Sequence, residues 1–456
     1  MWKVSPSLFR SSERSLQQLW KRFFLSDAYP CQEYWERRMS SPEFQSLKVS
    51  HLYHELDHQF QHFAKAPAIE IDLFTNLARD ESSFDDMEDI LHKFRLTPET
   101  LNTLPSTPHA VIRYYLATKH FQTLLKVLSD RLGYGIFPDD HCNNLMLDTF
   151  LKKKMYREAA KVATFQMLQE SFDHPITKYL SLYSCLKYLQ EPSDWHEHEP
   201  QPPPEPEDDV KVRVKFLINP YFDNHFDLKE ADDSIGKTVQ MIGKSLNDTI
   251  GNSCVLYGLV LRKKLEDAEA FINSLVSKNQ KGIVCKDVVT LVKEKLENFT
   301  EKIAENEKEE FEKKKAQFVE VLKNLESLTS DKDLLLLVED QVKKAVAEHE
   351  VDDIQNQCKL YENWEKERVL MYKSLLEERD RQKRLAVANQ KLRELEEKEE
   401  ELYFFENQDA IEMKVEEKLK EIAAREEKLK LIKKNIEEEY IPPEMPSAYP
   451  SQKKLD

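Results

Sequence analysis

Apolar residues recur at helical spacing in short runs between about Glu33 and Leu189. Prolines interrupt these runs at Pro67, Pro98, Pro105, Pro108, Pro138 and Pro175. We interpret the runs as helix hairpins with about a dozen residues in each arm. Because stacked hairpins form an α-solenoid, the pattern predicts an α-solenoid over residues 33–190.

The helical runs repeat with a fixed period. Leu124 and Ala159 lie 35 residues apart at equivalent places of a second helix, and Asp89 lies one such step earlier. His109 and Asn144 are separated by the same step, each in a first helix. A period of this length is typical of proteins in which each helix hairpin packs on the next.

The chain after residue 190 divides into segments of different composition. Residues 191–209 are rich in proline and acidic residues, which predicts an extended linker. Residues 210–286 are expected to hold further helix hairpins, although 210–218 alternate like a strand without a partner and are interpreted as an irregular connector. Residues 440–456 form a proline-rich tail with no packing pattern.

Long, charged helices are expected over 287–439. One stretch fits the a and d positions of a heptad until Glu399 interrupts it, at Leu385, Ala388, Leu392 and Leu395. Three interpretations stay open: a self-associating coiled coil, a helix lying against a partner, or a solvated helix held by i,i+4 Glu–Lys pairs. The predicted fold class is therefore all-α, a solenoid of helix hairpins followed by long charged, partly coiled-coil-like helices.

Composition agrees with a helical protein. The chain has 456 residues and a formal net charge of -17, with 33% charged residues and only 7 glycines. Few glycines with many Lys, Glu and Leu favour helices over sheets. No run approaches 18 apolar residues, so no membrane span is expected. None of the six cysteines lies within three residues of another, which excludes CxxC pairs and suits a reducing compartment.

Basic and apolar residues dominate the first 25 positions. A single acidic residue, Glu13, is set against five basic ones, Lys3, Arg10, Arg14, Lys21 and Arg22. An amphipathic, serine-rich and acid-poor start is typical of a mitochondrial presequence, which we predict for residues 1–25. The alternative is a basic amphipathic helix of the folded protein.

His54, Glu55 and His58 form an H-E-x-x-H sequence. On a helix, this spacing places two imidazoles one turn apart with a carboxylate between them, as in zinc peptidases. The longer H-E-x-x-H-x-x-G-x-x-H pattern fails, because Gln61 and Ala64 replace its glycine and its last histidine. We interpret the histidines as a polar helix face. A zinc peptidase is the low-ranked alternative, and it predicts stoichiometric zinc that is lost on His54→Ala.

Two G-K-[ST] sequences, at 236–238 and 243–245, are similar to the end of a phosphate-binding loop. Ala231 and Thr238 stand where each would need its first glycine, and no glycine-rich turn precedes either one. Without that turn the backbone amides cannot surround a phosphate. Both sequences are therefore expected to lie on a helix surface.

Basic residues are concentrated between residues 105 and 190. Eleven Lys and Arg stand against seven acidic residues there, a local charge of +4 in a chain of -17. Such a concentration fits binding to an RNA phosphate backbone, and a solubilising helix edge is the alternative. No arrangement for nucleophilic catalysis stands out, so no catalytic residue, metal ligand, cofactor or small-molecule substrate is expected.

The stretch 134–168 resembles a pentatricopeptide repeat. It contains a G-x-x-P-D turn at 135–139, an asparagine early in its first helix, Asn144, and a Glu-Ala-Ala opening of its second helix at 158–160. The 35-residue period agrees with this resemblance. The solenoid is therefore expected to be pentatricopeptide-like.

A closer resemblance rests on four segments that follow one another in the order of one family, 23–39, 91–98, 134–159 and 181–189. The chain resembles the pentatricopeptide-type small-subunit protein twenty-seven family of the animal mitochondrial ribosome, most strongly over 23–190 and weakly beyond 300. The resemblance implies a structural role in the mitochondrial small subunit, in the matrix, without catalysis. The implied partners are small-subunit ribosomal RNA and neighbouring mitochondrial ribosomal proteins.

Sequence-reading pentatricopeptide repeats use position five of a repeat together with its final residue to read one base. The corresponding pairs here are His109 with Asp139 and Asn144 with His174. The preceding repeat would offer two apolar residues, which cannot read a base edge. Recognition of folded RNA through its backbone and shape is therefore predicted instead.

The candidate RNA-binding residues are Lys152, Lys153, Lys154, Arg157, Lys161, Asn144, His109 and Arg113. The alternative to a ribosomal protein is a free mitochondrial pentatricopeptide RNA-binding factor that acts on transcripts or on translation. The two share fold and compartment and differ in stable association with the ribosome.

Overall fold

The computed structural model describes residues 24–196, 228–246, 248–277, 282–302, 305–326 and 328–439. Helices form almost all of the regular structure in these ranges, and the only strands there are two residues long. The predicted all-α, solenoid-like fold class is confirmed. The chain divides into two units, Met1–Tyr372 and Lys373–Asp456.

Several predictions fall wholly or largely outside the described ranges. These are the presequence, most of the acidic linker, the strand-like connector and the proline-rich tail, expected at 1–25, 191–209, 210–218 and 440–456. Within the described ranges, no helix combines the length and the apolar character that crossing a bilayer requires.

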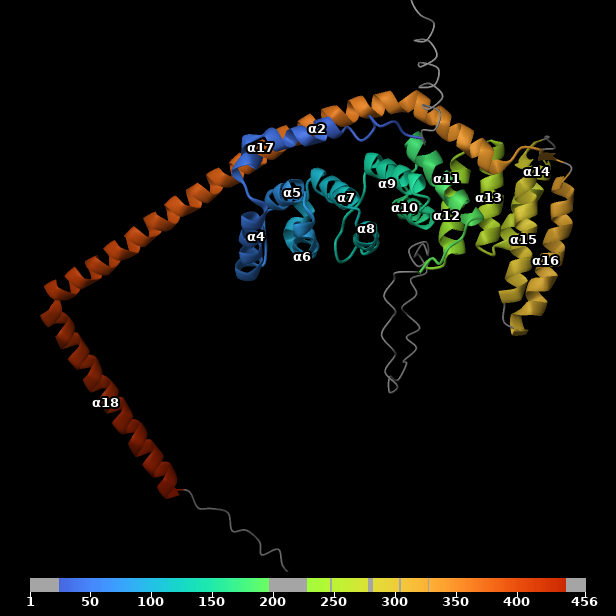
Figure 1. Ribbon diagram of the computed structural model, residues 1–456. Coiled ribbons are helices and arrows are strands. Elements are labelled where there is room, and N and C mark those ends of the chain that lie inside the picture. Colours follow the sequence, from blue (N-terminus) through green and yellow to red (C-terminus); the bar gives the residue numbers. More distant parts are fainter. Residues whose placement is uncertain are drawn as a thin grey trace, which may run out of the picture. The chain divides into compact units, whose positions relative to one another are not determined.

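Two layers of helices build the solenoid (Figure 1). The helices of the first layer pack on one another in chain order, α5 (Ala68–Leu77), α7 (Ser106–Thr118), α9 (Asp140–Lys152) and α11 (Pro175–Gln190). The second layer comprises α6 (Phe84–Arg95), α8 (Phe121–Ser129), α10 (Tyr156–Leu168) and α12 (Ala231–Ser245). A preceding helix, α4 (Val49–Phe63), packs on α5 and α6.

The turn before α9 shows how local sequence sets the start of a repeat. Gly135 has a φ of 65°, a left-handed value that residues with a Cβ rarely adopt. The fixed ring of Pro138 then precedes Asp139, whose carboxylate accepts a hydrogen bond from the backbone N–H of Cys142 at 2.6 Å. Asp139 thereby caps α9 and satisfies one of the unpaired N–H groups at its start.

The hairpins continue after the solenoid with helices α13 (Thr249–Leu261), α14 (Leu265–Ser277), α15 (Lys286–Lys302) and α16 (Glu305–Glu326). Two short parallel strands join this region, β1 (Val284–Cys285) and β2 (Thr329–Ser330). The strands were not expected from the sequence, because two residues are too few to show an alternating pattern.

The two G-K-[ST] sequences lie in a helix–helix contact. Gly236 and Gly243 of α12 face Gly251 and Gly258 of α13, and a Cβ on Gly258 would lie 2.5 Å from the carbonyl oxygen of Gly236. These glycines and Thr238 are buried. The prediction that both sequences lie on a helix surface is therefore wrong for these residues, which instead allow two backbones to approach closely.

A covering layer lies over the first-layer helices of the solenoid. It consists of residues 24–31, α2 (Gln32–Arg37), the 3-10 helix η1 (Arg38–Ser40), α3 (Pro42–Ser46) and the early part of α17 (Leu334–Glu406). Figure 1 shows α2 lying alongside α17. Trp35 of α2 packs with Tyr361 and Trp364 of α17 in one apolar cluster that also contains Ala110 of α7.

The second unit contains the remainder of α17 and helix α18 (Gln408–Glu439). The leucines of the expected heptad seam, Leu385, Leu392 and Leu395, are each more than half exposed. A coiled coil at these positions therefore stays a prediction, since its burial would need a partner helix.

Candidate nucleic-acid interface

Three consecutive lysines form the turn between the two helices of one hairpin. Lys152 is the last residue of α9, Lys154 takes a left-handed φ of 58°, and α10 begins at Tyr156. All three lysines are exposed. Successive ammonium groups on a short turn suit the closely spaced phosphates of an RNA backbone.

The lysines differ in how far other groups of the chain already compensate their charge. Lys152 forms an ion pair with Asp148 at 2.5 Å, and burial raises the pKa of that carboxyl although Lys152 opposes the shift. The ammonium of Lys153 lies 4.0 Å from the centroid of the Phe121 ring. Within the described part of the chain, Lys153 and Lys154 take part in no ion pair. These two lysines therefore carry the least compensated charge of the turn.

Arg157 and Lys161 follow on α10 but face different surroundings. Arg157 is buried, donates hydrogen bonds to the carboxylate of Glu158, and reaches the carbonyl oxygen of Asp194 at 3.1 Å. The ammonium of Lys161 lies 5.4 Å from the ring centroid of Trp195. The guanidinium of Arg157 is therefore not presented beside the exposed lysines.

The base-reading positions of the second repeat contact the covering layer. The side-chain N–H of Asn144 donates to the hydroxyl of Tyr29 at 2.7 Å, and Asn144 is fully buried. His174, the other member of the pair, lies 3.1 Å from a carboxylate oxygen of Asp353 in α17. Both side chains of this pair are thus bonded to the protein itself.

The two members of the base-reading pair of the first repeat, His109 and Asp139, are hydrogen-bonded to each other. Nδ1 of His109 lies 2.8 Å from Oδ2 of Asp139, and its Nε2 lies 2.9 Å from the hydroxyl of Tyr361. Arg113 also donates to that hydroxyl at 2.9 Å. Because the ionised carboxylate of Asp139 can only accept, the proton of His109 is assigned to Nδ1. Nε2 then accepts from the Tyr361 hydroxyl, which itself accepts from Arg113.

The titration behaviour of this pair agrees with the assignment of the proton. Burial lowers the pKa of His109, which favours the neutral imidazole. Burial acts to raise the pKa of Asp139, but His109 and the backbone N–H of Cys142 outweigh it and hold that pKa below its usual range. A neutral imidazole donating to a carboxylate is therefore the arrangement expected at neutral pH.

Arg113 is buried by the covering layer as well. Its guanidinium donates to the carbonyl oxygen of Pro30 at 2.7 Å and to the side-chain oxygen of Gln32 at 2.6 Å. Together with the Tyr361 contact, these bonds tie α7 to the segment before α2 and to α17. Arg113 holds the covering layer in place.

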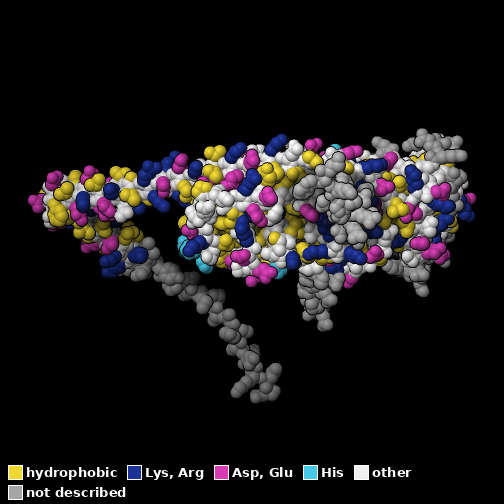
Figure 2. Space-filling view, turned by 45° about the horizontal axis from the view of Figure 1, so that its top comes forward, with side chains coloured by type: hydrophobic (Ala, Val, Ile, Leu, Met, Phe, Trp, Pro, Cys, Tyr) yellow, Lys and Arg dark blue, Asp and Glu magenta, His cyan; other side chains and the backbone are white. Residues whose placement is uncertain are grey.

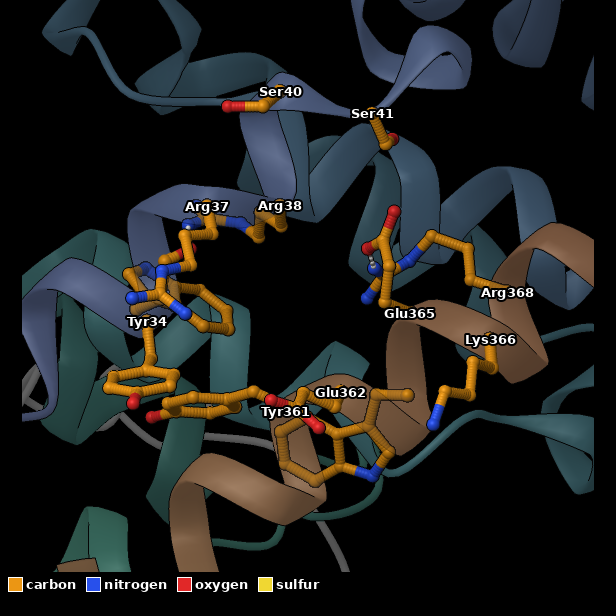
Figure 3. Close-up of a pocket in the computed structure, with 12 residues that line it drawn as sticks. Tyr34, Arg37, Arg38, Ser40, Ser41, Tyr361, Glu362, Glu365, Lys366 and Arg368 are labelled. Carbon is orange, nitrogen blue, oxygen red and sulfur yellow. Dashed lines mark hydrogen bonds and ion pairs between the residues drawn. The ribbon is translucent and has the colours of Figure 1, made fainter.

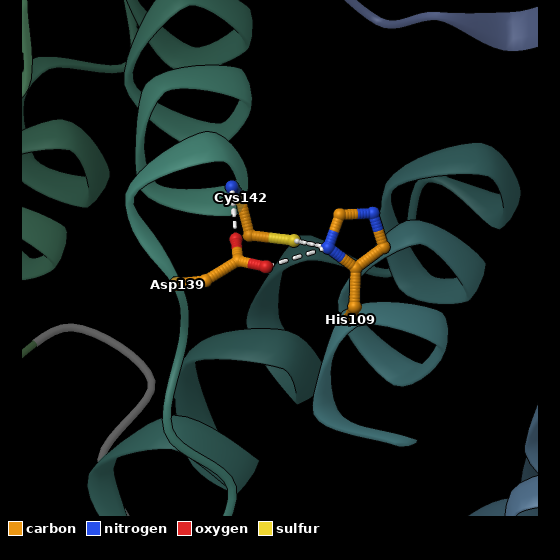
Figure 4. Close-up of side chains that lie close together, drawn as sticks. All are labelled: His109, Asp139 and Cys142. Carbon is orange, nitrogen blue, oxygen red and sulfur yellow. Dashed lines mark hydrogen bonds and ion pairs between the residues drawn. The ribbon is translucent and has the colours of Figure 1, made fainter. Parts of the chain in front are cut away.

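His109, Asp139 and Cys142 form the one group in the described ranges whose atoms are close enough to hold a metal ion (Figure 4). Nδ1 of His109 lies 2.8 Å from Asp139 and 3.2 Å from the Cys142 sulfur. A tetrahedral zinc ion would hold nitrogen and sulfur ligands about 3.5 Å apart. The observed distances are shorter and are those of hydrogen bonds.

The same three residues do not form a nucleophilic triad. The thiol and the carboxylate both contact Nδ1, so the imidazole cannot pass a proton from one to the other. Burial raises the pKa of the Cys142 thiol well above its usual value, which disfavours the thiolate. The cluster is best described as a hydrogen-bonded contact between α7 and α9.

The H-E-x-x-H histidines lie on the exposed side of α4. His54, Glu55 and His58 are exposed, whereas Leu52 and Leu56 form the buried side of the same helix. The interpretation of these histidines as a polar helix face is confirmed.

The stacked helix hairpins and the exposed lysine turn are those of a helical solenoid protein with a basic surface site. Among the residues described above, no group of side chains is arranged for catalysis. The family model for mitochondrial 28S ribosomal protein S27 matches residues 2–394, which is most of the chain. The chain therefore belongs to the mitochondrial 28S ribosomal protein S27 family. It is a protein of the mitochondrial small ribosomal subunit in the matrix, and the family resemblance found in the sequence is confirmed.

Proposed function

We propose that the chain is a structural, RNA-contacting component of the mitochondrial small subunit that supports mitochondrial translation and catalyses no reaction. The observation that carries the proposal is the exposed lysine turn at 152–154, which the half-buried Lys161 follows on α10. Lysine ammonium groups on a rigid turn bind phosphates as point charges and fix register without reading sequence.

The proposal places RNA contacts on the lysines rather than on all eight candidate residues. His109, Arg113, Asn144 and Arg157 are buried and bonded to other groups of the chain. Contact between RNA and these four side chains would require the covering layer or the Asp194 segment to leave. In the arrangement described, they support the solenoid that presents the lysines.

Recognition through backbone and shape is favoured by the same contacts. Both base-reading pairs of the pentatricopeptide-like repeats already have hydrogen-bond partners in the protein, at Tyr361 and Tyr29. A base would have to displace these partners from a buried site. Phosphate and ribose contacts at the solenoid edge need no such displacement.

Charge over the surface as a whole does not mark the interface. Figure 2 shows Lys and Arg side chains interspersed with Asp and Glu over the face in view. The proposal therefore rests on the local density of lysine at the turn. Exposed apolar side chains of the second unit, among them Leu402, Tyr403 and Phe405, would bind neighbouring ribosomal proteins.

Sedimentation of detergent-lysed mitochondria through sucrose at moderate and at high salt tests the proposal. We expect the protein to migrate with the small subunit at both salt concentrations. A pool that is free, or that high salt removes from the subunit, would instead support the free RNA-binding factor. The RNA recovered with that pool would then be identified.

A further inference from the structure

A pocket lies within the first unit, between the α2–η1 stretch and α17 (Figure 3). Its volume is about 440 Å³, within the range of small-ligand sites. Its lining comes from two stretches, 34–41 and 361–368. Figure 3 shows Ser41 and Glu365 pointing toward one another on one side of the open space, with Tyr34 and Tyr361 along another side.

Three polar atoms of the pocket residues are buried and lack a hydrogen-bond partner. They are Nε of Arg38, the hydroxyl of Ser41 and Oε1 of Glu365. Arg38 is held in place by its contact with the Asn76 carbonyl oxygen at 3.1 Å, and Glu365 by Arg368 at 2.7 Å. Buried polar atoms without partners are uncommon, and here a donor, a hydroxyl and an acceptor line one space.

Aromatic rings form the apolar part of the pocket. The rings of Trp35 and Tyr361 lie 5.3 Å apart, and those of Tyr361 and Trp364 lie 5.7 Å apart, measured between centroids. Tyr34 packs against the same cluster and is only partly buried. Arg37 already lies over one face of the Tyr34 ring, 4.1 Å from its centroid, and Arg38 over one face of Trp35 at 3.6 Å. A nucleobase can stack on a remaining flat face of such rings.

Positive charge surrounds the aromatic rings. Four cationic side chains line the pocket against two carboxylates, Arg37, Arg38, Lys366 and Arg368 against Glu362 and Glu365. Arg38 is also shared with a smaller adjoining cavity of about 150 Å³ that Arg79 and Arg113 line. Burial, with Arg79, Arg113 and Arg368 nearby, lowers the pKa of Arg38 to about 9. An anion placed here would relieve this repulsion.

We propose that the pocket binds one unpaired nucleotide. The base lies against the rings of Tyr34 and Trp364, and its polar edge meets Arg38, Ser41 and Glu365. The phosphate lies beside Arg37 and Arg38, because Arg368 is already paired with Asp72 and Glu365. A simple anion would leave the Glu365 oxygen without a donor, and an apolar ligand would leave all three polar atoms unpaired. The pocket is separate from the lysine turn at 152–154, so nucleotide binding in the pocket does not depend on RNA contact at that turn.

The source of the nucleotide can be a single-stranded segment of RNA or a free mononucleotide, since both carry the same groups. Binding of AMP to the full-length protein is measured by calorimetry. Binding of a labelled eight-nucleotide adenosine oligomer is measured by fluorescence anisotropy, with AMP as competitor. If AMP binds and displaces the oligomer, the pocket is a mononucleotide site. If the oligomer binds and AMP does not displace it, the ligand is single-stranded RNA. Crosslinking with ultraviolet light locates the bound oligomer on the chain.

Matched variants separate stacking from packing and charge. Tyr34→Ala should weaken binding about 5- to 150-fold, the range for loss of one stacked base, whereas Tyr34→Phe keeps the ring and the affinity. Lys366→Glu should weaken binding, and Lys359→Glu, two turns away on α17 and outside the pocket, should not. Lys153→Glu with Lys154→Glu should leave AMP binding unchanged.

The proposal is overturned if neither probe binds, or if both bind equally to wild type and Tyr34→Ala with no crosslink in 34–41 or 361–368. Occupation of the pocket by a peptide of a neighbouring protein would also overturn it. Failure of these variants to affect binding would leave the sedimentation result untouched, so the two proposals can fail separately.

Discussion

Nε of Arg368 in α17 donates a hydrogen bond to Oδ2 of Asp72 in α5 across 2.7 Å, although 296 positions separate the two residues. Both are buried, at 2% and 0% exposure. The other carboxylate oxygen of Asp72 accepts hydrogen bonds from the hydroxyls of Ser106 and Thr107, at the start of α7. One carboxylate thus joins two successive first-layer helices to the covering layer.

Removing one partner of this ion pair should destabilise the first unit strongly. Arg368→Met leaves the Asp72 charge buried without its cation, and we expect a loss of about 3–5 kcal/mol in the free energy of unfolding. Urea unfolding followed by circular dichroism measures this loss.

The control for this prediction is Arg381→Met, which removes an exposed Arg–Glu pair from the same helix and should cost about 0.5 kcal/mol or less. The double variant Arg368→Met with Asp72→Asn should be less destabilised than the sum of its single variants. Equal losses for Arg368→Met and Arg381→Met would show that the buried pair does not hold the covering layer.

The contact between α12 and α13 predicts that a single methyl group is poorly tolerated. In Gly258→Ala the new carbon would meet the carbonyl oxygen of Gly236 at 2.5 Å, so the two backbones must separate. We expect a loss of about 1–3 kcal/mol and a lower midpoint of thermal unfolding. Gly133→Ala is the comparison, because its methyl group meets the side chain of Asp130, which is exposed and can turn away. A larger loss for Gly133→Ala would contradict the backbone contact.

The buried histidines predict how stability depends on pH. Burial lowers the pKa of His141 to about 3, well below its usual value of about 6.5. Between these values the unfolded chain binds a proton that the folded chain does not. The free energy of unfolding should therefore fall as the pH decreases from about 6.5, by about 1.4 kcal/mol per pH unit. Urea unfolding between pH 7 and pH 5 measures the slope, which His141→Gln should reduce.

His174 provides the opposite case. The hydrogen bond to Asp353 outweighs burial and raises the pKa of His174, so its contribution is present at low pH and is lost as the pH rises through the folded value. His174→Gln should therefore make the stability of the protein rise more steeply with pH above about 6.5. An unchanged slope in both variants would mean that other groups set the pH dependence.

The solenoid could be predicted from the sequence because its causes are local. The left-handed Gly135 and the cap supplied by Asp139 act within a few positions of each other. The period of 35 residues repeats the hairpin unit along the chain. Exposure of the lysines at 152–154 also follows from a turn between two apolar runs. The close contact between α12 and α13 was not predicted, although the seven-residue spacing of Gly236 with Gly243, and of Gly251 with Gly258, places each glycine pair on one face of its helix.

The covering layer could not be predicted because its contacts join distant parts of the chain. Tyr29 meets Asn144 across 115 positions, and Tyr361 meets His109 across 252. Neither helical periodicity nor charge balance carries information about such pairs. This layer decides which candidate residues are accessible to RNA. It buries three of the eight candidate residues and leaves the lysine turn exposed.

The lysine turn gives the most direct prediction for function. In Lys153→Glu with Lys154→Glu, the two lysines with the least compensated charge become acidic, while the capped helix α9 and the buried core of α10 are unchanged. We expect the variant protein to fold but to enter the small subunit less efficiently. In vitro, its binding to small-subunit ribosomal RNA should show a shallower dependence on salt, by roughly one unit of logarithmic slope for each phosphate that the protein no longer neutralises.

Lys119→Glu is the matched control for the turn variants. Lys119 follows α7 with a φ of 62°, as Lys154 follows α9 with 58°, so the same substitution meets the same left-handed backbone in the preceding hairpin. Lys119 is a single lysine rather than one of three, and its reversal should change the salt dependence less. If both variants enter the subunit as well as wild type, and their salt slopes are equal to that of wild type, RNA contact does not take place at this turn. Because phosphate contacts act through charge, Lys153→Arg with Lys154→Arg should keep the wild-type slope.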